Sequence, residues 1–357
     1  MTLAYNLIMA VVDLAALANL RRQKRLLVWA AGIGCLGMIA LVLAVVLGEN
    51  HFVISRLAAY GLFGHLVFVL LAAAGLLWRS RRIAAVGSGL MAAALLAIAA
   101  DAFLIEPEWL DVSHVRIATG KIDRPLRIVV LADLQTDRIG PYERSVLQRT
   151  LQADPDLILL AGDYLQPPWP QRGELYGQLN ALLRELDFRA AQGVFAVRGN
   201  IDPSDWMEIF KGLDVNPVDS TRSFELDCLR LTCLDLYDSY NPQLHVENDA
   251  PDRFHLVVGH VPNFALGRVD ADLLVAGHTH GGQVRFPFIG PVFTHALVPN
   301  DWAAGLTELP GGGRLLVSRG VGMERCGAPR MRFLCRPEIV VVDLIPADWY
   351  NAPKKGK

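Results

Sequence analysis

The chain has 357 residues, enough for two or three domains, and its formal net charge at pH 7 is only −2. A charge balance this close to zero argues against a nucleic-acid partner, which would need a basic surface. Hydrophobic residues make up 52% of the chain, and the apolar excess is concentrated before Pro107.

Three N-terminal apolar runs are long enough to cross a membrane, because about 20 apolar residues span the core of a bilayer. They cover 26–48, 57–78 and 83–100. Residues 2–20 are also apolar, but Asn6 and Asp13 interrupt them, so this segment is either a fourth span or an interfacial helix. We therefore expect a transmembrane region of three or four helices at 1–105, and not the buried helices of a soluble domain.

Basic residues around these runs predict the orientation of the chain in the membrane. They cluster in two places: Arg21, Arg22, Lys24 and Arg25, and then Arg79, Arg81 and Arg82. The positive-inside rule puts both clusters in the cytoplasm. The expected protein is thus a multi-pass membrane protein whose second half is extracytoplasmic. If one segment does not span the bilayer, the second half is cytoplasmic instead.

After Pro107 the sequence changes to short β-branched runs separated by polar helical stretches. Alternation of this kind predicts an α/β layered domain. Apolar residues recur every three or four positions at 142–152 and 174–188, which predicts helices there. The expected strands are 127–132, 157–161, 194–197, 229–235, 255–258, 273–276, 314–318 and 339–344. The expected parts are a linker at 106–124, the α/β domain at 125–345 and a polar tail at 346–357.

Five of these strands are followed closely by a residue that can bind a metal ion. The residues are Asp133, Asp163, Asn200, His260 and the pair His278 and His280. Ligands bind at the carboxyl ends of strands in open α/β sheets, so these side chains converge if the strands are neighbours. One such residue alone is usually part of a turn, but turn chemistry does not readily explain five. We therefore predict a metal site.

The mixture of ligands indicates which ions the site holds. Two aspartates, an asparagine and three histidines are too many for one tetrahedral zinc ion. Shared between two divalent ions they are compatible with Mn²⁺, Mg²⁺, Fe or Zn²⁺. Such a pair can clamp the attacking and leaving oxygens of a displacement at phosphorus, and it provides hydroxide from a shared water at neutral pH. The sequence thus predicts a phosphohydrolase in which His278 and His280 reach different ions.

The motifs resemble the calcineurin-like metallophosphoesterase family, in which D-x-H, GD, GNH[DE], GH and GHxH follow one another. The corresponding pieces here are DLQ at 133–135, GD at 162–163, GNID at 199–202, GH at 259–260 and GHTH at 277–280. The sequences GGQ, SRG and PEI that follow resemble a branch with N-terminal membrane segments, which includes relatives of enzymes that cleave UDP-diacylglucosamine. The resemblance implies a four-layer sandwich, with helices outside two β-sheets, that hydrolyses phosphate ester or diphosphate bonds.

The resemblance also implies roles for the matched residues. One ion would be held by Asp133, Asp163 and His280, and the other by Asp163, Asn200, His260 and His278. Gln135 stands where the family usually has a histidine ligand. Its carbonyl oxygen is a weak, hard ligand, which favours Mg²⁺ or Mn²⁺, and we expect Mn²⁺.

Ile201 stands where many members of the family have a histidine that protonates the leaving group. Isoleucine cannot do this, and loss of a general acid typically costs about 10²–10⁴-fold in rate. A substrate with a good leaving group can be hydrolysed without a general acid. We therefore expect a phosphoanhydride, or a small-molecule, lipid or glycolipid phosphate. Another side chain supplying the proton is the alternative.

Two further hypotheses remain open. The first is a metal-binding module with the same fold that has lost turnover, which Gln135 and Ile201 favour. The second is a transporter or channel with an appended domain. Intramembrane charges would mark its pathway, and only Asp13, His65 and Asp101 within or beside the spans count toward one.

Cysteines and arginines complete the set of candidate residues. The sequence contains no CxxC motif, so a zinc ribbon is not expected. If the domain is outside, a Cys326–Cys335 disulfide is one expectation; buried free thiols at Cys228, Cys233, Cys326 and Cys335 are the other.

The stretch 166–170 either lines the mouth of the site, contacts the membrane or forms an ordinary loop. Arginines that could contact phosphate are Arg198, Arg285, Arg319, Arg325 and Arg330.

Overall fold

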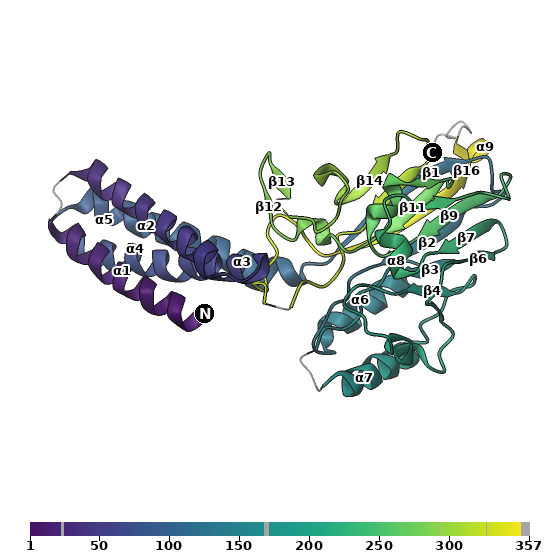
Figure 1. Ribbon diagram of the computed structural model, residues 1–357, viewed down its shortest axis with the longest axis horizontal. Coiled ribbons are helices and arrows are strands. Elements are labelled where there is room, and N and C mark those ends of the chain that lie inside the picture. Colours follow the sequence, from purple (N-terminus) through teal and green to yellow (C-terminus); the bar gives the residue numbers. More distant parts are fainter. Residues whose placement is uncertain (23–24, 168–170, 292, 326, 351–357) are drawn as a thin grey trace, which may run out of the picture. The chain divides into compact units, whose positions relative to one another are not determined.

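The computed structural model describes residues 1–22, 25–167, 171–291, 293–325 and 327–350 (Figure 1). Cys326, part of the stretch 166–170 and most of the expected polar tail therefore lie outside the described residues. The chain divides into two compact units. The first unit comprises Met1–Ile105 and Glu324–Arg330, and the second comprises Glu106–Met323 and Met331–Lys357.

The first unit is built from four long apolar helical stretches, each long and apolar enough to cross a membrane. The third and fourth stretches are partly π-helical. The stretches are α1 (Thr2–Arg22), α2 (Leu26–Leu47), α3 (His51–Ala59) with η1 (Tyr60–Leu66) and α4 (Val67–Leu77), and α5 (Arg82–Ala100) with η2 (Asp101–Ile105). Large apolar side chains on the outside of this unit, such as Leu27 and Ile83, are exposed, as expected for helices that face lipid.

Asp13 and Asn6 of α1 each have a partner inside the first unit, although Oδ1 of Asp13 has none among the described residues. Asp13 is buried, and its Oδ2 lies 2.7 Å from Nδ1 of His65 in η1. The other ring nitrogen of His65 lies 3.0 Å from Oδ1 of Asn6. Hydrogen bonds of this kind join neighbouring helices in a membrane. The two residues that interrupt the first apolar run are therefore compatible with a helix long and apolar enough to cross a membrane.

Two six-stranded sheets form the second unit. In sheet order, the first contains β1 (Asp111–Thr119), β16 (Glu338–Pro346), β2 (Leu126–Leu131), β3 (Leu157–Leu160), β4 (Val194–Val197) and β5 (Asn216–Val218). The second contains β14 (Gly305–Glu308), β15 (Arg314–Val317), β11 (Leu273–Ala276), β9 (Phe254–Val258), β7 (Leu229–Cys233) and β6 (Arg222–Glu225). Every strand expected from the sequence is present, within two residues at each end.

The two sheets pack face to face through buried aliphatic side chains, such as Ile128 and Val130 of the first sheet against Leu256 and Val258 of the second. The outer face of the first sheet is covered by α6 (Pro141–Gln152) and α7 (Arg172–Glu185), as Figure 1 shows. The second sheet is covered more thinly: the short helix η5 (Pro262–Leu266) packs Phe264 into the apolar cluster there, Trp302 packs against that cluster, and the short helix α8 (Leu236–Tyr240) contacts η5. The expected α/β sandwich is confirmed, with a thin fourth layer.

Within the two six-stranded sheets, the strands not expected from the sequence are the four edges, β1, β5, β6 and β14. Residues 111–119, which we expected in the linker 106–124, form β1 and pair in parallel with β16. An edge strand packs on fewer neighbours than a central strand, so it lacks the continuous apolar run that marks a buried one. The alternating sequence DVSHVRIAT of β1 is an example.

The remaining elements are short. The strand pairs are β8 (His245–Val246) with β10 (Arg268–Val269), and β12 (Arg285–Phe286) with β13 (Gly290–Pro291). The helical turns are η3 (Glu106–Glu108), η4 (Trp206–Phe210), η6 (His280–Gly282), η7 (Asn300–Trp302) and α9 (Ala347–Tyr350), the last of which lies in the expected polar tail.

Candidate metal centre

The predicted ligands follow parallel, adjacent strands of both sheets. In the first sheet β2, β3 and β4 pair in parallel and lead to Asp133, Asp163 and Asn200. In the second sheet β9 and β11 pair in parallel, with His260 after β9 and the pair His278 and His280 after β11. The first sheet thus supplies oxygen ligands and the second supplies nitrogen ligands, at the carboxyl ends of the strands.

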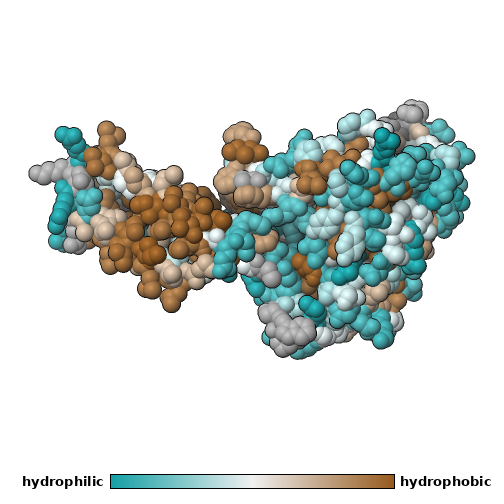
Figure 2. Space-filling view, in the orientation of Figure 1, coloured by the Kyte–Doolittle hydropathy of each residue, from teal (hydrophilic) through white to brown (hydrophobic). Residues whose placement is uncertain are grey.

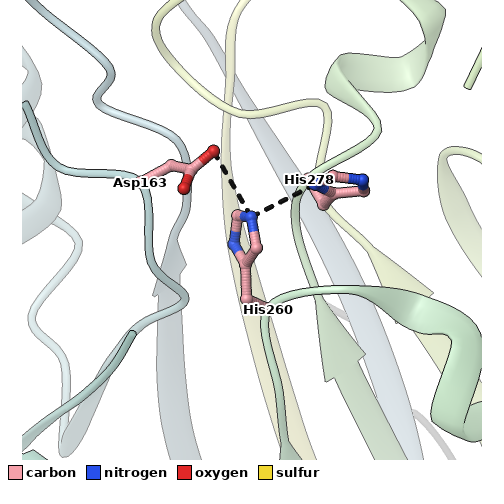
Figure 3. Close-up of side chains that lie close together, drawn as sticks. All are labelled: Asp163, His260 and His278. Carbon is pink, nitrogen blue, oxygen red and sulfur yellow. Dashed lines mark hydrogen bonds and ion pairs between the residues drawn. The ribbon is translucent and has the colours of Figure 1, made fainter. Parts of the chain in front are cut away.

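Four of these side chains meet at one point. The ligand atoms of Asp163, His260 and His278 all lie within 4.8 Å of one another (Figure 3). His260 Nε2 lies 3.3 Å from Asp163 Oδ2 and 3.3 Å from His278 Nδ1. Asn200 Oδ1 lies 2.9 Å from His260 Nε2 and 2.6 Å from His278 Nδ1. Asn200 is exposed, so a substrate can approach the cluster from its side.

The other nitrogen of each ring fixes the tautomer. His260 Nδ1 lies 2.7 Å from the carbonyl oxygen of Ala161, and His278 Nε2 lies 3.1 Å from that of His295. A carbonyl oxygen only accepts hydrogen bonds, so each neutral ring donates its N–H there and turns a lone pair toward the cluster. When both rings are neutral, two ring nitrogens, an amide oxygen and a carboxylate oxygen face one another with no proton between them. This set of atoms fits a divalent cation.

The three remaining predicted ligands, Asp133, Gln135 and His280, are buried but lie outside this four-atom cluster. Both carboxylate oxygens of Asp133 accept the backbone N–H of His278, at 3.0 and 3.1 Å. Gln135 Nε2 donates to Gln166 Oε1 at 3.1 Å. Nδ1 of His280 is buried and has no hydrogen-bond partner among the residues that the structure describes. A buried imidazole nitrogen without a partner is costly, and a metal ion nearby would satisfy the ring.

Most of the predicted ligands have a strained backbone. Five of them have positive φ angles between 35° and 69°: Asp133, Gln135, Asp163, His278 and His280. Non-glycine residues rarely adopt this left-handed conformation, and such residues cluster at functional sites, where the surrounding structure holds the strain.

Burial and mutual charge determine the ionisation of the cluster. Burial would lower the pKa of His260, but the neighbouring carboxylate of Asp163 raises it to about 9. Burial and the adjacent His260 lower the pKa of His278 to about 4. Burial, reinforced by the charge of Asp163, raises the pKa of Asp133 to about 7. In the absence of a cation, positive charge at His260 balances the buried carboxylates, and a metal ion would take over that role.

Asp202, the last residue of GNID, supports the ligand loops from behind. Its Oδ2 accepts the backbone N–H groups of Asp163 and Gly199, both at 2.8 Å, and its Oδ1 accepts that of Tyr164 at 2.9 Å. The loops approach so closely that a Cβ at Gly199 would lie 2.1 Å from Asp163 Oδ1. Asp202 was expected only as part of the GNID motif, with no role of its own, although the acidic residue that ends this motif is a signal for that role.

Replacing Asp202 with alanine is expected to lower turnover by about 10–100-fold, the usual effect of removing a group that orients metal ligands. Three buried N–H groups would lose their acceptor, so the unfolding temperature should also fall. Steady-state kinetics and thermal unfolding of the full chain in detergent test this. The control is Asp205→Ala, three residues along and exposed, which should leave turnover unchanged; equal turnover in the two variants would contradict the role of Asp202.

Two of the predicted phosphate-binding arginines are engaged within the protein. Arg319 pairs with Asp111 at 2.9 Å and with Glu338 at 3.0 Å. Arg198 Nε donates to the carbonyl oxygen of Asp202 at 2.9 Å. These contacts give both side chains a structural role.

Two buried side chains that were not predicted as site residues, Arg332 and Cys335, hold the backbone near the metal centre. Arg332 is fully buried, and its guanidinium donates to backbone carbonyl oxygens of Arg319, Gly320, Gly322 and Cys335. The Cys335 thiol is buried and donates to the carbonyl oxygen of His280 at 3.2 Å. The expected disulfide of Cys335 involves Cys326, which lies outside the described residues.

Comparison with known proteins identifies the domain that carries these residues. Residues 126–282 match the family described as calcineurin-like phosphoesterase. The chain carries a calcineurin-like phosphoesterase domain. It is 27% identical over 258 residues to the uncharacterized metallophosphoesterase YkuE of Bacillus subtilis (strain 168), covering 67% of this chain and 87% of that protein. It is 28% identical over 262 residues to the phosphodiesterase YaeI of Escherichia coli (strain K12), covering 67% and 90%.

Among solved structures, a dimetal phosphatase from Danio rerio matches with a TM-score of 0.37 and 14% identity, over 56% of this chain and 88% of that one. The family match and the two sequence relatives confirm the resemblance seen in the motifs. The protein is a metal-dependent phosphoesterase, and long apolar helices precede its phosphoesterase domain.

Proposed function

We propose that this phosphoesterase is a membrane-anchored phosphohydrolase whose site binds two divalent metal ions. The observation that carries the proposal is the convergence of four lone-pair donors, with both histidine tautomers fixed by backbone carbonyl oxygens. Asp163, Asn200, His260 and His278 would hold one ion. Asp133, Gln135 and His280 would hold the other, with Asp163 shared between the two.

The bound ions would stabilise charge on phosphoryl oxygens and activate water at neutral pH, and the oxygen donor of Gln135 favours Mn²⁺ or Mg²⁺. The chain's own residues hold the geometry. Asp163 is oriented by the backbone N–H of Ile201, which donates to its Oδ1 at 3.0 Å. Asp133 is oriented by the backbone N–H of His278.

The identity of residue 201 bears on the substrate. Its backbone contact with Asp163 puts Ile201 beside the metal centre, yet its side chain has no proton to give. The substrate we infer is a phosphoanhydride, or a small-molecule, lipid or glycolipid phosphate with a good leaving group. The name of the E. coli relative, a phosphodiesterase, supports a substrate in which phosphorus carries two substituents.

We further propose that the second unit is extracytoplasmic. The support is the distribution of arginine and lysine around the four apolar helices. Fusing alkaline phosphatase or green fluorescent protein to the C-terminus tests the orientation. Active phosphatase with dark fluorescent protein is expected, and the reverse pattern would place the unit in the cytoplasm.

Metal removal tests the proposed chemistry directly. The full chain purified in detergent should contain nearly two divalent ions per molecule and should hydrolyse bis(p-nitrophenyl) phosphate with added Mn²⁺. Dialysis against EDTA should abolish turnover, because the ions would polarise the phosphoryl oxygens and activate the attacking water, and Mn²⁺ should restore it. One ion or none, with no turnover at any Mn²⁺ concentration, would favour the second candidate, a metal-binding module without turnover. Gln135 and Ile201 are the observations behind that candidate.

A further inference from the structure

A short hairpin next to the metal centre exposes apolar side chains to solvent. It consists of β12, the turn 287–289 and β13, and we call it the apolar hairpin. Phe288 at its tip is fully exposed and Ile289 is 75% exposed. Figure 2 shows an apolar surface over these elements. Soluble proteins rarely expose contiguous apolar patches unless the patch binds something.

The chain beyond the hairpin extends this surface. Phe293 is 58% exposed and Leu297 is 65% exposed. Phe288 also has a φ of 66°, a conformation that is costly for a bulky side chain. Exposure of these apolar side chains is unfavourable in water, and it is accounted for if the tip lies in an apolar medium.

The apolar hairpin is tied to the metal centre at both ends. At its start, Arg285 Nη1 donates to the carbonyl oxygen of Gly281 at 3.3 Å, inside the turn that begins with His280. Beyond its end, the carbonyl oxygen of His295 accepts the hydrogen bond from Nε2 of His278. The backbone that presents the apolar tip therefore also positions the two histidines of the GHTH motif.

The apolar medium we infer is a lipid bilayer, because the chain carries its own candidate membrane anchor. It contains four helices long and apolar enough to cross a membrane, and the last of these candidate spans, Arg82–Glu108, ends just before β1 begins at Asp111. The short tether keeps the second unit within reach of the bilayer surface. Side chains such as Phe and Leu can be buried at the boundary of headgroups and acyl chains, and a basic residue beside them, here Arg285, is attracted by anionic headgroups.

We propose that the apolar hairpin docks into the lipid bilayer surface, with Phe286, Phe288 and Ile289 among the acyl chains. The turn that carries His278 and His280 is then held at the level of the lipid headgroups. This surface is additional to the four helices, and its binding to lipid does not require turnover at the metal centre.

Photocrosslinking of the full chain in vesicles tests the docking. A photoreactive phenylalanine analogue replaces Phe288 by codon suppression, and the protein is reconstituted into vesicles of phosphatidylethanolamine and phosphatidylglycerol. The control carries the same analogue in place of Tyr237, which is 80% exposed on α8. After irradiation, mass spectrometry of the peptides measures phospholipid adducts. We expect at least about fivefold more adduct at 288 than at 237, because only the hairpin tip should enter the acyl region.

Equal adduct yields at the two positions would overturn the proposal, as would crosslinks from position 288 to a second copy of the chain. A second variant carries the analogue at position 288 together with Phe286→Ser and Ile289→Ser. Its lipid adduct at 288 should be severalfold lower, since two of three apolar side chains at the tip are lost. An unchanged yield in that background would also overturn the proposal. Neither result depends on metal content, so failure of the proposed hydrolysis would leave this test intact.

Discussion

Replacing His260 with asparagine is expected to lower kcat/KM by about 1,000-fold or more, because metal ions contribute several kcal/mol of charge stabilisation in the transition state and each 1.4 kcal/mol is about tenfold in rate. The substitution removes Nε2, which lies within 3.3 Å of ligand atoms of Asp163, Asn200 and His278. The measurements are hydrolysis of bis(p-nitrophenyl) phosphate with saturating Mn²⁺ and metal content per chain, which should fall below that of the wild type.

His255 provides a matched control in β9, the strand that leads to His260. It is also a buried histidine, and its Nδ1 lies 2.6 Å from a backbone carbonyl oxygen, that of Asp270. Its Nε2 contacts Thr232 at 2.8 Å and not the cluster. His255→Asn should therefore destabilise the fold and leave the metal content unchanged. If the two variants lost activity equally, the loss would reflect folding, and His260 would not be a ligand.

Replacing Ile201 with histidine is expected to raise the rate on substrates with poor leaving groups by about 10²-fold, the lower end of the usual contribution of general acid catalysis. The backbone N–H that contacts Asp163 is retained in this variant, so the metal centre should stay intact. The measurement compares kcat/KM for an alkyl phosphodiester and for a nucleoside diphosphate derivative in both proteins. The gain should be confined to the alkyl substrate, because the phosphate that departs from a phosphoanhydride is a good leaving group and needs no protonation.

Ile201→Asn is the control for the size and polarity of the new side chain, and it should show no such gain. A wild-type enzyme that already cleaves the alkyl ester faster than the diphosphate would contradict the inferred preference. In that case another side chain donates the proton, and Ile201→His should have little effect.

The sequence by itself determined the central strands and the residues that end them. Central strands such as β3 and β9 are buried on both faces, so they appear as continuous apolar runs. A polar residue that stops such a run is conspicuous, which is why Asp163 and His260 could be selected without a structure. The long apolar helices were evident for a similar reason, since runs of that length without charge suit a bilayer.

Tertiary structure decided the features that depend on contacts between distant segments. Edge strands such as β1 are defined by their pairing partners and carry no distinctive apolar run. The role of Asp202 arises from three backbone N–H groups on two separate loops. The tautomers of His260 and His278 depend on carbonyl oxygens 99 and 17 residues away. A sequence records which side chains are available, and only the fold decides which donor meets which acceptor.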